Sequence, residues 1–97
     1  MSRRRKRLER LRRNVNNVSL ADLRRILEDY GFEYRKTVGS HYTFSYVLGD
    51  ETRLFVVPFR RPLKPIYVRR ALKIIDEIIQ EQGEDEPDNA ESDEQES

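Results

Sequence analysis

The apolar residues of this chain recur at helical spacing in two segments, which flank a region where apolar and polar residues alternate. Ser19 is a good N-cap and Gly31 a suitable stop, so we predict a first helix that begins at Leu20. Pro65 suits the first position of a second helix, which we expect to end near Gln82. The predicted inner stripes contain Leu20, Leu23, Ile26, Leu27 and Tyr30, and then Val68, Ala71, Leu72, Ile75, Ile78 and Ile79.

Three strands are predicted between these helices. They cover residues 32–38, 41–48 and 53–57. Turns beginning at Gly39 and Gly49 join them in sequence, and Pro58 ends the hydrogen bonding of the third strand. Two consecutive hairpins make an antiparallel meander, so both helices are free to cover the same face of the sheet.

The alternation within the strands separates the two faces of the predicted sheet. We expect the buried parity to contain Phe32, Tyr34 and Val38, followed by Tyr42, Phe44, Tyr46 and Leu48. His41 has the opposite parity and is expected on the open face. The sequence therefore predicts an α+β fold, a two-layer αβββα domain in which a three-stranded antiparallel sheet carries two helices on one face.

Composition limits the chemistry that this domain can perform. The chain has 97 residues, 38% of them charged, with one His and no Cys. Thiolate zinc sites and disulfide scaffolds are thereby excluded, and we expect chemistry that needs no metal or other cofactor. No apolar run approaches the roughly 20 residues that span a bilayer. We therefore expect a cytoplasmic protein without a membrane partner.

The net charge of +1 conceals a strong asymmetry along the chain. Residues 1–13 contain eight Lys or Arg and one acidic residue, whereas residues 81–97 contain nine acidic residues and no basic one. We predict a basic N-terminal arm at residues 1–17, helical only when docked or bound to an anion, a domain at residues 18–82 and a disordered acidic tail at residues 83–97. The arm is either an electrostatic contact for RNA or a solvated charge run, and the tail either keeps the chain soluble or screens its basic surface.

His41 is the main candidate for chemistry, because an imidazole is the side chain best suited to proton transfer near neutral pH. Arg60, Arg61 and Lys64 directly precede the second helix, whose N-terminal amides favour an anion such as phosphate. The alternative is that these cations only keep the linker soluble. The helix and strand order with basic residues at this position resembles the double-stranded RNA-binding domain.

Several short motifs together resemble the HicA family, also called YcfA-like, of toxin mRNA interferases. The motifs are Gly39, Ser40 and His41, then Phe44, Val57 and Pro58, then Leu63, Lys64 and Pro65, and finally Val68, Arg69 and Leu72. The match covers about residues 18–80. The resemblance implies a ribonuclease of a type II toxin-antitoxin pair, held inactive by a HicB-like antitoxin, with His41 as the catalytic residue. Many members have a second His where this chain has Arg60.

The mechanism that we expect is attack by an RNA 2′-hydroxyl on its own adjacent phosphate. His41 would act as general base or acid, and Lys36, Arg60 or Lys64 would stabilise the charge of the phosphorane. The residues predicted to contact the substrate are Ser40, Lys36, Arg60, Arg61 and Lys64. The second proton carrier is unassigned, since Tyr42 points inward by parity and Tyr67 is a weak candidate.

Two other functions fit the same sequence. A non-catalytic RNA-binding module would use the same basic residues, and its binding would fall steeply with salt and survive His41→Gln. A protein-interaction domain would dock a partner chain on the open sheet face or at its edge.

Overall fold

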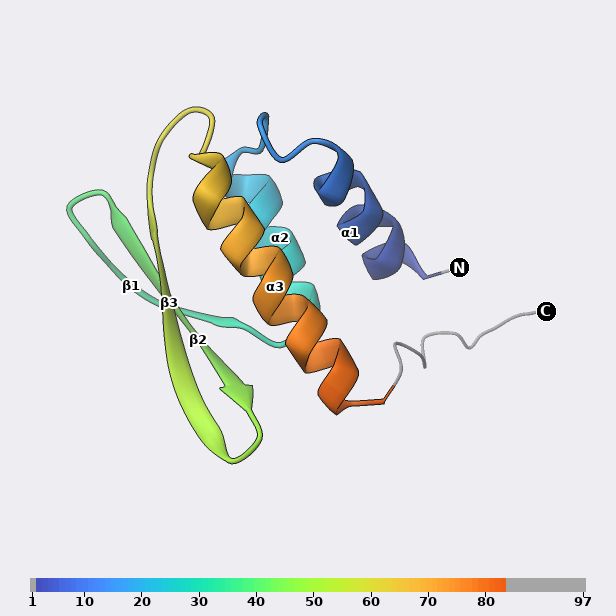
Figure 1. Cartoon of the computed structure of the whole chain (residues 1–97). Helices are drawn as coiled ribbons and strands as arrows, with labels where there is room; N and C mark the ends of the chain where they lie inside the picture. The colour runs from blue at the N-terminus through green and yellow to red at the C-terminus, as the bar shows by residue number, and fades with distance from the viewer. Residues whose placement is uncertain (1, 84–97) are drawn as a thin grey trace.

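A computed structural model describes residues 2–83, which form one antiparallel sheet and three helices (Figure 1). In chain order these elements are α1 (Arg3–Arg13), α2 (Leu20–Asp29), β1 (Glu33–Val38), β2 (His41–Leu48), β3 (Glu51–Pro58) and α3 (Pro65–Glu81). The predicted α+β fold with a three-stranded sheet is confirmed, and the predicted acidic tail lies, apart from Gly83, outside the described residues. Within residues 2–83 no helix is long and apolar enough to cross a membrane.

The two predicted helices begin where their capping residues indicate. The Ser19 hydroxyl accepts a hydrogen bond from the backbone N–H of Asp22 at 3.0 Å, which satisfies one of the free donors at the start of α2. Gly31 follows the helix with φ +92°, a conformation that favours glycine. Pro65 occupies the first turn of α3, and Lys64 is its N-cap residue.

The sheet has the order β1-β2-β3, with both neighbouring pairs antiparallel, and α2 and α3 cover one of its faces (Figure 1). Phe44, at the centre of β2, is completely buried between the sheet and the helices. The side chains that fill this layer are Leu23, Leu27, Phe32, Phe44, Tyr46, Phe55, Val57, Val68 and Ile75. The aromatic parity of β2 therefore faces the helices, as its alternation predicts.

Two residues expected to be buried in β1 are exposed. Tyr34 faces the helices but is 37% exposed, whereas Val38 lies on the other face because of a β-bulge. Tyr34 is paired with Phe44, but the next pair is Lys36 with Thr43, so Arg35 is an extra residue in β1. The extra residue reverses the alternation for the rest of the strand. Val38, expected among the buried residues, is instead 64% exposed.

The N-terminal segment is a docked helix and not a free arm. Leu8 and Leu11 of α1 are 3% and 4% exposed, and α1 packs on the side of the helical layer away from the sheet (Figure 1). Arg7 forms two hydrogen bonds with the Asp29 carboxylate, at 2.8 and 3.0 Å, and these raise the pKa of the guanidinium. The αβββα domain thus carries an additional helix, held by two leucines and by ion pairs.

Candidate active site

His41 is exposed at the first position of β2, the central strand of the sheet. It is paired with Val38 on one side and with Pro58 on the other, so all three share the open face, which no helix of residues 2–83 covers. The backbone N–H of Phe59 donates a hydrogen bond to the Ser40 carbonyl at 2.6 Å. This bond fastens the turn that precedes His41 to the end of β3.

The bulge in β1 brings Lys36 to the face of His41. Lys36 is paired with Thr43, and Thr43 has the same parity as His41 two residues earlier in β2. Simple alternation from Tyr34 would have directed Lys36 toward the helices. An exposed cation therefore lies two residues along the strand from the Val38–His41 pair, in the next cross-strand pair on the same face.

Arg61, another of the predicted cations, does not lie on the same face as His41. The Arg61 guanidinium lies 5.4 Å from the centre of the Phe59 ring, and this ring packs against Tyr42, which faces the helices. Arg61 also lines a hollow with residues at the start of α2. The anion site predicted before α3 is therefore divided, with Arg61 on the helical side, and Lys64 exposed at the N-cap without a side-chain capping bond.

Arg60 and Ser40 are both exposed, and the hydrogen bond from the Phe59 N–H to the Ser40 carbonyl joins the two segments that contain them. Arg60 follows Phe59 directly, and Ser40 directly precedes His41. Both are therefore held at the end of the sheet where His41 lies, although their side chains make no hydrogen bond or ion pair within residues 2–83.

Neither tyrosine considered as a second proton carrier lies on the open face. Tyr42 is paired with Val57 on the helical side, and Tyr67 belongs to α3, where Arg70 lies over its ring at 5.4 Å. Glu33 is paired with Ser45 and so does share the open face. It is four residues along the strand from His41, a separation of about 13 Å, which is too long for direct proton exchange.

The open face is more apolar than the alternation of residues in β2 predicts. Four exposed aliphatic side chains share it with His41. They are Val38, Val47, Leu54 and Val56, with exposed fractions of 64%, 59%, 65% and 41%. The signal was present in β3, where Leu54 and Val56 alternate with the buried Phe55 and Val57, so that both parities are apolar.

Comparisons of this chain with protein-family models, with curated proteins and with solved structures find no match. The resemblance to the HicA family, with its catalytic histidine, thus stays a prediction.

Proposed function

We propose that the chain is a metal-independent endoribonuclease, an mRNA interferase of the HicA type that acts in the cytoplasm as the toxin of a type II pair. The observation that carries the proposal is the position of His41. It is solvent-exposed on the open face of the sheet, with Lys36 on the same face and Ser40 beside it. A phosphodiester approaching this face would meet a proton carrier and a cation together.

In the proposed reaction, the 2′-oxygen of the substrate forms a bond to its adjacent phosphorus while the bond from phosphorus to the 5′-oxygen breaks. His41 removes the proton of the 2′-hydroxyl, and water or the resulting imidazolium protonates the leaving oxygen. Lys36 stabilises the negative charge that develops on the phosphoryl oxygens. General base catalysis contributes about 10²- to 10⁴-fold and one electrostatic donor about 10²- to 10³-fold, which predicts a slow nuclease.

The test is cleavage of a single-stranded RNA in the presence of EDTA. We expect His41→Gln to lower the rate by about 10²- to 10⁴-fold with an unchanged circular dichroism spectrum. Val47→Thr, at an exposed position on the same face and strand, is the matched control and should cleave normally. Cleavage by His41→Gln at the wild-type rate would reject the catalytic role.

The aliphatic residues around His41 support a protein partner on the same face, and a HicB-like antitoxin is the partner that we propose. Val38 and Val56 flank the end of the sheet where His41 lies, and Leu54 continues the apolar surface along β3. Burying such side chains in an interface is favourable by about 25 cal/mol per Å² of apolar area. An antitoxin seated there would cover the imidazole and exclude RNA.

The second candidate is a non-catalytic RNA-binding module. It is favoured by the αβββα order, which is that of the double-stranded RNA-binding domain, and by the position of Arg61 on the helical side, away from the histidine. Intact RNA recovered after binding, with the same affinity in His41→Gln as in the wild type, would select this function over the nuclease.

A further inference from the structure

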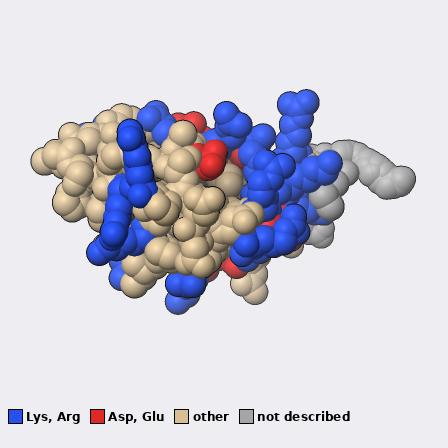
Figure 2. All heavy atoms as spheres, turned by 90° about the horizontal axis from the view of Figure 1, so that it is seen from above, with Lys and Arg blue, Asp and Glu red and all other residues tan. Residues whose placement is uncertain are grey.

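The outer face of α1 carries a row of cations without internal partners. Arg3, Lys6, Arg10 and Arg13 are exposed, and within the described part of the chain their side chains form no hydrogen bond or ion pair. Figure 2 shows Lys and Arg gathered over this helix, at the end of the molecule away from the sheet. The other basic residues of α1 engage the domain or nearby side chains, so these four, the outer row, are the ones available to a ligand.

The spacing of the outer row is regular. Its members lie three, four and three residues apart, which places them within an arc of about 80° on the helix, opposite Leu8 and Leu11. The row is about 15 Å long, since each helical residue rises about 1.5 Å. That length corresponds to four or five phosphates of a nucleic acid strand, which rises about 3.4 Å per nucleotide.

Like charges at this spacing repel one another along a helix, so the row opposes helix formation. The helix is nevertheless held in place, by Leu8 and Leu11 in the core and by Arg7 on Asp29. A fixed row of mutually repelling cations is the arrangement that an external polyanion relieves. No carboxylate of residues 2–83 pairs with the row.

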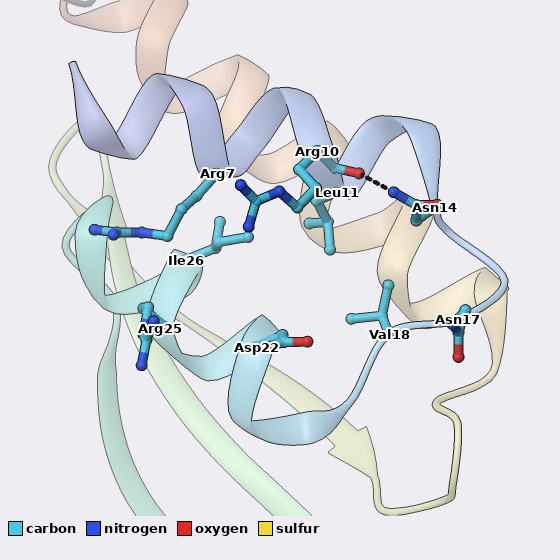
Figure 3. Close-up of a pocket in the computed structure, with 9 residues that line it drawn as sticks. All are labelled: Arg7, Arg10, Leu11, Asn14, Asn17, Val18, Asp22, Arg25 and Ile26. Carbon is cyan, nitrogen blue, oxygen red and sulfur yellow. Dashed lines mark hydrogen bonds between the residues drawn. The ribbon is translucent and has the colours of Figure 1, made fainter.

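A cleft continues the row toward α2 (Figure 3). Its volume is about 340 Å³, and Arg10 belongs both to the row and to the cleft. Arg25 of α2 adds a second exposed cation, and Leu11, Val18 and Ile26 form the apolar wall of the cleft. The polar groups at the loop end of the cleft are the side chains of Asn14, Asn17 and Asp22.

We propose that the outer row and this cleft form a binding surface for the phosphate backbone of single-stranded RNA, separate from the face of His41. The row holds consecutive phosphates. One nucleotide enters the cleft, with its phosphate between Arg10 and Arg25 and its base against the apolar wall. The side-chain amides of Asn14 and Asn17 and the Asp22 carboxylate can then reach the edge of the base. The choice of RNA as the polyanion rests on the proposed function.

The helical layer lies between this surface and the open face of the sheet (Figure 1). A single phosphate therefore cannot contact both. A strand bound on α1 must pass around the domain to reach His41, or else α1 retains RNA while another segment of the same molecule is cut. Affinity and cleavage are then separable properties.

The test uses the full chain with His41→Gln, so that RNA stays intact, and a labelled single-stranded RNA of 20 nucleotides followed by fluorescence anisotropy. In this background we expect Lys6→Gln, Arg10→Gln and Arg13→Gln combined to weaken binding by about tenfold or more at 50 mM salt. The slope of log affinity against log salt should fall in magnitude by about 2. Exposed-face changes to glutamine, a good helix former, should leave the circular dichroism spectrum unchanged.

The matched control is Arg24→Gln, Arg53→Gln and Arg70→Gln combined, which removes the same charge at sites outside α1 and the cleft. Each of these cations already contacts a carboxylate or an aromatic ring. An equal loss of affinity in both triple variants would overturn the proposal in favour of a diffuse field, and so would an unchanged affinity in the α1 variant.

Amide chemical shifts on RNA titration locate the surface. We expect changes in α1, in residues 14–18 and at the start of α2, and changes confined to β1 and β2 would overturn the proposal. Wild-type protein that binds RNA through α1 but never cuts it would refute the nuclease alone. Wild-type protein that binds anionic vesicles and no RNA would overturn the RNA surface.

Discussion

The substitution Leu11→Ala tests how α1 is held against the rest of the domain. Leu11 is 4% exposed and belongs to the single core of the domain. Replacing a buried leucine by alanine removes its transfer free energy and leaves a cavity, at a cost of about 2 to 5 kcal/mol. A domain of this size has about 3 to 5 kcal/mol of stability in total. Leu11→Ala should therefore remove most of the stability or release α1.

The ion pair between Arg12 and Asp76 is the natural comparison. It also joins α1 to the domain, and its hydrogen bond raises the pKa of Arg12, but the two side chains are 36% and 51% exposed. Exposed pairs contribute about 0.2 to 1 kcal/mol. We therefore expect Arg12→Gln to be at least twofold less destabilising than Leu11→Ala.

Urea unfolding followed by circular dichroism at 222 nm measures both variants against the wild type. Hydrogen exchange of the α1 amides then distinguishes local release of the helix from global unfolding, because only local release leaves the amides of β2 protected. A larger loss of stability in Arg12→Gln than in Leu11→Ala would refute the view that the two leucines hold this helix.

Two further predictions concern the open face of the sheet. In single-turnover cleavage measurements, Lys36→Gln should lower the rate of RNA cleavage by about 10²- to 10³-fold. Arg61→Gln, on the helical side, should change that rate by less than about threefold. Equal effects of the two substitutions would contradict this division. Leu54→Asp, at a 65% exposed position, should change the free energy of unfolding by about 0.5 kcal/mol or less. It should nevertheless weaken the binding of a HicB-like partner, measured by calorimetry, by about tenfold or more. An unchanged affinity for the partner would exclude β3 from that interface.

The elements with strong local signals could be predicted from the sequence. Ser19 and Gly31 mark the ends of α2, and Pro65 marks the start of α3, because capping chemistry is local. The exposed position of His41 follows from parity, since the aromatic residues of β2 had to be the buried set. Its catalytic role stays a prediction.

The features that could not be predicted depend on tertiary contacts. Nothing in the residues around Arg35 indicates a bulge, because no glycine or turn residue is present there. A regular strand and a bulged strand fit this local sequence equally well. The docking of α1 was also beyond local reasoning, since an 11-residue helix with Leu8 and Leu11 as its buried residues is marginal alone and gains its stability from packing. The division of the linker cations likewise follows from where the Phe59 ring packs.

The bulge in β1 also has a consequence for how this chain can vary. Arg35 is a surplus residue whose insertion the strand absorbs locally, so Lys36, Thr37 and Val38 face as they would in a shorter, regular strand. Deleting the Arg35 codon should therefore leave the neighbours of His41 in place. In a regular strand, an inserted residue would move every following side chain to the opposite face. Here the extra residue is confined to the bulge, so we expect this segment to accept a change of length while the side chains next to His41 keep their face.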